Sequence, residues 1–137
     1  MFEVANRYRR LTEPVVRGPI GIAVTVAVFL AASRVGSRDG LAIASAWILV
    51  SGLYCLANFW CCRETHCVVT GGGWTALALL GLAAGVIPGD ALSFVHIGVV
   101  VAVYLVILAA GYGFQAVMAA RTGSHSLGVG RDGTQAR

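Results

Sequence analysis

The sequence predicts an all-α integral membrane protein, a four-helix bundle whose single transmembrane domain covers residues 1–137. Its composition is one reason: 58% of the residues are hydrophobic and 12% are charged, whereas about 25% are charged in soluble proteins. The mean hydropathy of +0.80 agrees with this. The other reason is a succession of apolar runs close to the ~20 residues that a helix needs to cross a bilayer. We therefore expect one unit embedded in a lipid bilayer, without a separate soluble domain.

The apolar runs place the four helices one after another. The predicted spans are approximately 18–34, 41–60, 67–87 and 92–119. The first is short for a span, and the third reaches membrane length only if it begins at Cys67 rather than at Trp74. The fourth is long enough to tilt or to project from the bilayer. The polar, glycine-rich segment 121–137 is predicted to be a disordered tail.

The first apolar run also has a second interpretation. A basic segment, an apolar run and the sequence AAS at 31–33 are typical of a secretory signal that is cleaved near Ser33. We favour an uncleaved first helix, because the segment before the apolar run is long for a signal. Cleavage would leave three spans.

The arginines predict the orientation in the membrane. All ten basic residues are arginine, and cytoplasmic loops carry an excess of Arg and Lys. With the N-terminus inside, only Arg34 and Arg38 lie outside. The cytoplasmic arginines are then Arg7, Arg9, Arg10, Arg17, Arg63, Arg121, Arg131 and Arg137. We therefore expect a multi-pass protein of the cell inner membrane with both termini cytoplasmic. No basic face indicates binding of nucleic acid.

The stretch CCRETHC at 61–67 gathers three of the four cysteines and one of the three histidines. It follows the second predicted span directly. Arg63 and Glu64 are expected to form a tight turn, and Thr65 is in position to cap the third helix. The stretch is therefore predicted to lie between the second and third helices, at the cytoplasmic face of the membrane.

Four residues of this stretch are candidate metal ligands: Cys61, Cys62, His66 and Cys67. Cys62 and His66 lie one turn apart if helical geometry persists, and a tight hairpin returns Cys67 toward Cys61. A nearby arginine and a helix N-terminus both favour the thiolate form. Thiolates with an imidazole suit soft or borderline ions. We expect no permanent cofactor, but Hg²⁺, Cu⁺ or Zn²⁺ as cargo or ligand.

Three residues outside the stretch are candidates for a relay: Cys55, Asn58 and His96. Cys55 and Asn58 share a helix face with Cys62, so they extend a polar and polarizable stripe into the bilayer. The alternative, which we favour, is that Cys55 packs as a small apolar residue and Asn58 hydrogen-bonds to another helix. His96 is either a ligand at the entry side or a polar residue settled at the membrane interface.

The glycine run at 71–73 has two interpretations as well. It allows the second helix to approach the third closely, or it breaks the third helix into a re-entrant turn that lines a cavity. We favour close packing.

The vicinal pair Cys61 and Cys62 at the membrane border of a four-span chain of this length resembles the small inner-membrane proteins of bacterial mercury-resistance systems. This resemblance implies a carrier that passes mercuric ion inward between cysteine pairs and delivers it to a cytoplasmic reductase. It covers the architecture and this one pair. The chain departs from the family pattern because its first helix holds no cysteine pair.

We therefore predict a transporter or carrier of a soft metal ion that works by thiolate exchange, and not an enzyme. Two other functions stay open. One is a membrane thiol redox protein in which Cys67 pairs with Cys61 or Cys62, although the cytoplasm keeps thiols reduced. The other is a structural subunit with a zinc-stapled hairpin or, in a eukaryotic host, with a palmitoylated pair. A cytoplasmic metal carrier as partner and a homo-oligomer are both compatible with the sequence.

Overall fold

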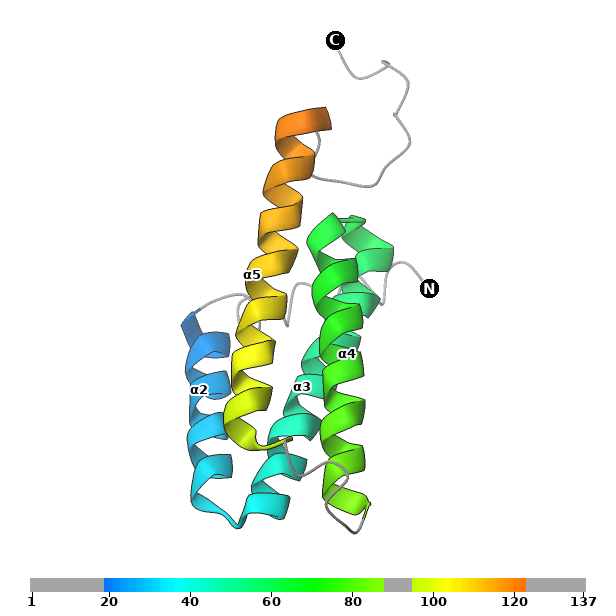
Figure 1. Cartoon of the computed structure of the whole chain (residues 1–137). Helices are drawn as coiled ribbons and strands as arrows, with labels where there is room; N and C mark the ends of the chain where they lie inside the picture. Colours follow the sequence, from blue (N-terminus) through cyan, green and yellow to red (C-terminus); the bar gives the residue numbers. More distant parts are fainter. Residues whose placement is uncertain (1–18, 88–94, 123–137) are drawn as a thin grey trace.

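The computed structural model describes residues 19–87 and 95–122, except for the side chains of residues 19, 37, 60–62 and 122. In this part of the chain four helices follow one another: α2 Pro19–Arg34, α3 Ser37–Cys62, α4 Thr65–Val86 and α5 Ile97–Thr122. Consecutive helices run in opposite directions and pack side by side (Figure 1). The predicted all-α class with four packed helices is therefore confirmed.

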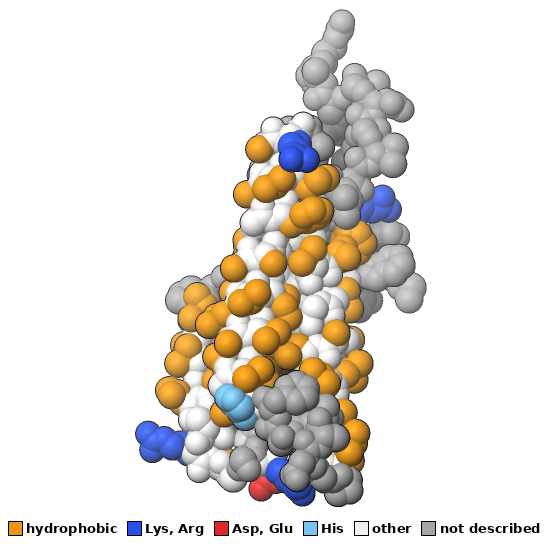
Figure 2. Space-filling view, viewed as in Figure 1, with side chains coloured by type: hydrophobic (Ala, Val, Ile, Leu, Met, Phe, Trp, Pro, Cys, Tyr) orange, Lys and Arg blue, Asp and Glu red, His pale blue; other side chains and the backbone are white. Residues whose placement is uncertain are grey.

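Three of the four helices are long and apolar enough to cross a membrane: Arg38–Phe59, Thr65–Val86 and Ile97–Arg121. The shorter apolar helix α2 does not reach this length within the described residues, so its crossing stays a prediction. Hydrophobic side chains cover the flanks of the bundle and arginines lie toward its ends (Figure 2). Exposed apolar surface of this extent suits contact with lipid. The chain is an integral, multi-pass membrane protein.

The helix bounds can be compared with the predicted spans. α3 contains the whole of the predicted span 41–60, and α4 begins at Thr65, two residues before the predicted start at Cys67. α5 continues to Thr122, so it includes the first residues of the predicted tail. The start of the fourth predicted span and the tail from residue 123 onward lie outside the described residues.

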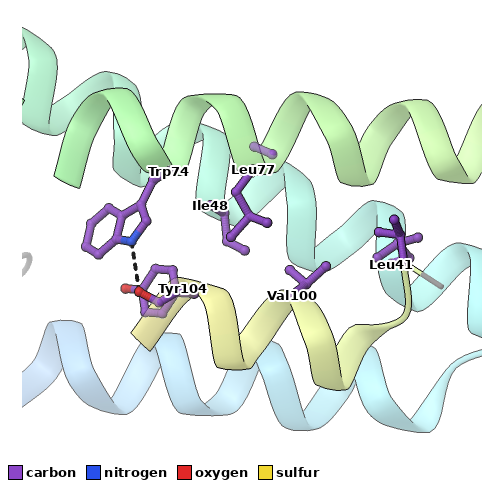
Figure 3. Close-up of a cluster of buried hydrophobic side chains, with 8 residues drawn as sticks. Leu41, Ile48, Trp74, Leu77, Val100 and Tyr104 are labelled. Carbon is purple, nitrogen blue, oxygen red and sulfur yellow. Dashed lines mark hydrogen bonds between the residues drawn. The ribbon is translucent and has the colours of Figure 1, made fainter. Parts of the chain in front are cut away.

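A cluster of buried side chains joins the helices in the middle of the bundle. It includes Leu41 and Ile48 from α3, Trp74 and Leu77 from α4, and Val100 and Tyr104 from α5 (Figure 3). The Trp74 ring stacks on the Tyr104 ring at 4.4 Å between centroids, and Trp74 Nε1 donates a hydrogen bond of 3.2 Å to the Tyr104 carbonyl. Phe29 of α2 packs edge-on against the same Tyr104 ring. Tyr104 therefore connects α2, α4 and α5.

The most extensive contact is between α3 and α4, and glycines allow it. A Cβ atom on Gly71 would lie 3.0 Å from the Gly52 carbonyl oxygen and 3.0 Å from the Leu56 backbone nitrogen. On the other side of α4, a Cβ atom on Gly73 would lie 2.8 Å from the Ile107 side chain of α5. The glycine run is part of a continuous helix, so the predicted close packing is confirmed.

Candidate metal centre

The candidate centre lies at the turn between α3 and α4. α3 ends at Cys62, and Arg63 adopts the left-handed conformation with φ 51° and ψ 26°. The Arg63 N–H donates to the Phe59 carbonyl at 2.8 Å, which closes the last turn of α3. Glu64 is extended, and α4 begins at the next residue. The predicted two-residue turn of Arg63 and Glu64 is therefore present.

One local expectation was wrong, and the condition attached to another is not met. The N-cap of α4 is Glu64 rather than Thr65: the Cys67 N–H donates to the Glu64 carbonyl at 3.1 Å, and Thr65 is already helical. The Glu64 side chain makes no capping hydrogen bond. Helical geometry also does not continue from Cys62 to His66, because the left-handed Arg63 between them reverses the chain.

Three side chains with different ligand chemistry meet at the first turn of α4. Ligand atoms of Glu64, His66 and Cys67 all lie within 4.8 Å of one another. Cys67 Sγ is 3.5 Å from His66 Nε2, and Glu64 Oε2 is 3.5 Å from His66 Nδ1. A thiol, an imidazole and a carboxylate so close together form a group that can hold a metal ion.

The surroundings of Cys67 suit a ligand sulfur. The residue is 1% exposed, and Asn58 Nδ2 of α3 donates to its Sγ at 3.9 Å. Its position in the first helical turn adds the positive end of the α4 dipole, which favours the thiolate. The His66 side chain is 12% exposed and that of Glu64 is 32% exposed. The centre therefore has a buried sulfur side and a carboxylate side that is partly open.

α5 packs a ring against the imidazole of the centre. The Tyr112 ring stacks on the His66 imidazole, with 5.0 Å between centroids and 14° between planes. Next to it, a Cβ atom on Gly111 would lie 2.5 Å from Thr70 Cγ2, so only glycine allows α5 to come this close to α4. Thr70 Oγ1 in turn donates to the His66 carbonyl at 2.6 Å. The His66 ring is therefore stacked on a ring of α5, while its backbone carbonyl accepts a hydrogen bond within α4.

Of the four predicted ligands, the structure brings His66 and Cys67 together. Cys61 and Cys62 are the last two residues of α3, but their side chains lie outside the described part of the structure. Glu64, which belongs to the group, had been interpreted only as a turn residue.

The relay candidates lie in three different places. Asn58 makes the hydrogen bond between helices that was its alternative interpretation, and its acceptor is the cluster residue Cys67. Cys55 is half-buried and packs against the hydrophobic core. His96 is exposed and precedes α5, roughly 24 Å along that helix from Tyr112 at 1.5 Å per residue. The structure does not bring His96 to the cluster.

The fold and the site define a multi-pass helical membrane protein with a candidate metal-binding group at the turn of a helix hairpin. Comparison with protein-family models, curated proteins and solved structures finds no match to this chain. Thiolate and imidazole ligands favour soft or borderline metal ions, Zn²⁺ among them, over Mg²⁺ and Ca²⁺.

Proposed function

We propose that this protein carries a soft or borderline metal ion at the membrane and that the α3–α4 turn is its loading site. One observation supports this most strongly: Glu64, His66 and Cys67 place three kinds of metal ligand within 4.8 Å of one another, at the turn between two apolar helices. Ionisable side chains are costly in a membrane-spanning bundle, and where they occur they usually mark a functional site. The proposed activity is transfer of the ion rather than catalysis.

Transfer proceeds by exchange of ligands. Cys67 and His66 bind the ion. Cys61 and Cys62, the last two residues of α3, transfer it to this pair or accept it from this pair. Each incoming thiol forms one sulfur–metal bond and releases its proton to water, while the outgoing thiolate breaks its bond and takes up a proton. The number of bonds to the ion is conserved, so no step leaves the ion without ligands.

Orientation and cargo are part of the same proposal. The arginine distribution favours a cytoplasmic α3–α4 turn, where a metal reductase or a soluble metal carrier can receive the ion. Mercuric ion is the cargo that the resemblance to mercury-resistance proteins implies. Cu⁺ and Zn²⁺ satisfy the same ligand chemistry.

Metal accumulation in cells that lack a mercuric reductase tests this function. Cells that express the protein are expected to accumulate the carried ion among Hg²⁺, Cu⁺ and Zn²⁺, and to become hypersensitive if that ion is Hg²⁺. The Cys67→Ser variant and the double variant Cys61→Ser, Cys62→Ser are expected to lose this gain. Cys55→Ser, about two helical turns before the end of α3, is the matched control and should retain it. Accumulation of all three ions no higher than in cells without the protein would refute the proposal.

A further inference from the structure

His66 presents its two ring nitrogens to two different neighbours. Nε2 faces Cys67 Sγ at 3.5 Å, and Nδ1 faces Glu64 Oε2 at 3.5 Å. Nδ1 is buried and has no hydrogen-bond partner among the described residues, because its contact with Glu64 is too long or too bent to be one. A neutral imidazole binds an ion through one nitrogen and carries a proton on the other. The side on which the ion binds therefore decides the role of Glu64.

The distance between Cys67 Sγ and His66 Nε2 fits tetrahedral coordination. Metal–sulfur and metal–nitrogen bonds of about 2.3 and 2.05 Å at a tetrahedral angle place the two ligand atoms about 3.5 Å apart. The same bonds in a straight line would place them about 4.3 Å apart. The two atoms are in hydrogen-bonding contact at 3.5 Å, and this distance also matches the tetrahedral value, so they can share a Zn²⁺-like ion without moving apart.

Burial and ligand type favour the sulfur side over the carboxylate side. The distance from Nδ1 to Glu64 would also fit an ion, but the Glu64 side chain is 32% exposed whereas Cys67 is 1% exposed. A borderline metal ion binds thiolate sulfur in preference to carboxylate oxygen. The Cys67 sulfur is also buried and accepts a hydrogen bond from Asn58. Once Nε2 holds the ion, Nδ1 must carry the proton, and this buried N–H needs an acceptor.

We propose that the ion binds to Cys67 Sγ and His66 Nε2 in tetrahedral geometry, and that Glu64 is a positioning residue which accepts the His66 Nδ1–H rather than a metal ligand. This inference rests on the metal site of the proposed function and narrows its cargo to tetrahedral ions of the Zn²⁺ type. A shift of a few tenths of an ångström by the half-exposed Glu64 completes the hydrogen bond. The two remaining coordination positions stay open to water or to exchanging thiols.

Cobalt spectroscopy on the full chain in lipid nanodiscs tests the role of Glu64. Co²⁺ is expected to show a thiolate charge-transfer band and the intense visible bands of tetrahedral cobalt, and Zn²⁺ should displace it. Glu64→Ala should keep the same bands but bind about 10- to 100-fold more weakly. Glu64→Gln retains an oxygen acceptor without charge, so its metal affinity should fall less than that of Glu64→Ala. The affinity of Glu64→Asp should fall least. Asp39→Ala is the control, because Asp39 is an exposed acidic residue in the first turn of α3.

The outcomes separate this inference from the proposed function. If Glu64→Ala shifts the cobalt bands, Glu64 is a ligand and the inference is wrong, although the metal site remains. Unchanged affinity in Glu64→Ala would also refute the inference. If the wild-type chain shows no cobalt bands and retains no Zn²⁺, the inference and the metal site both fail. Metal binding with the predicted spectra but without accumulation in cells would overturn only the carrier function.

Discussion

At the scale of single residues, the chemistry of Cys67 depends on what surrounds it. A cysteine in apolar surroundings is inert, because burial disfavours the thiolate. Cys67 is buried, but the Asn58 amide donates to its sulfur and the residue lies in the first turn of α4. The His66 imidazole 3.5 Å away is a candidate second ligand. Cys55, by contrast, packs against the hydrophobic core and lies outside the candidate ligand group of the described residues.

Tyr112 should contribute to metal affinity without touching the ion. Its ring stacks on the His66 imidazole, and an aromatic pair of this kind contributes about 0.5–1.5 kcal/mol. Tyr112→Ala should therefore weaken Zn²⁺ binding by up to about tenfold, measured by competition with a chelator, whereas Tyr112→Phe should bind like wild type. Phe114→Ala removes an exposed ring from the same helix and is the control. Equal losses in the Ala variants at 112 and 114 would contradict the stacking role.

The residues of the site differ in how well they could be predicted from the sequence. His66 and Cys67 stood out because cysteines and a histidine gather in one short stretch. Glu64 lies in the same stretch and could have been included, since metal-binding histidines commonly donate their other ring N–H to a carboxylate. Tyr112 carries no local signal, because its contact with His66 depends on how α5 packs against α4.

At the scale of elements, the α3–α4 hairpin is the part that builds the site. The left-handed Arg63 turns the chain within two residues, and Gly52 and Gly71 bring the two helix backbones into contact below the turn. Close approach is what allows Asn58 on α3 to reach Cys67 on α4. The glycines therefore serve the metal site as well as the packing.

Gly71→Ala should separate α3 from α4. The added Cβ would meet backbone atoms of α3 at 3.0 Å, and overpacking of this kind costs about 1–3 kcal/mol. The free energy of unfolding in mixed micelles should fall by that amount, and metal affinity should fall with it. Gly72→Ala is the matched control, because nothing lies within 4 Å of a Cβ atom there. Because alanine favours the helix over glycine, Gly72→Ala should not lose stability, and similar losses at both positions would contradict the role of the contact with α3.

The helices could be predicted better than their contacts. Length and hydropathy predict four packed helices, because membrane spans are long apolar runs that stand out in a sequence. The turn at Arg63 and Glu64 was predicted, but the cap at Glu64 and the left-handed conformation of Arg63 were missed, because a left-handed arginine has no distinctive sequence signal. The glycine run was informative, since only one of its two interpretations agrees with a continuous helix.

At the scale of the whole molecule, the polar chemistry is divided between two ends. The metal group lies at the end of the bundle where α3 turns into α4 (Figure 1). Exposed Arg34, Arg38 and His96 belong to the opposite end, where α2 meets α3 and α5 begins. Between the ends, the described flanks are mainly apolar (Figure 2). This division predicts that the metal ion binds at one face of the membrane. The apolar bundle would hold the α3–α4 turn at that face.

Metal stoichiometry of the purified chain in nanodiscs tests the central claim most directly. Equilibrium dialysis against Zn²⁺ should give one tightly bound ion per wild-type chain. The double variant His66→Ala, Cys67→Ser should bind none, while Cys55→Ser should bind one. A wild-type chain that retains no ion, or a double variant that retains as much as wild type, would contradict the claim that the α3–α4 turn is a metal site.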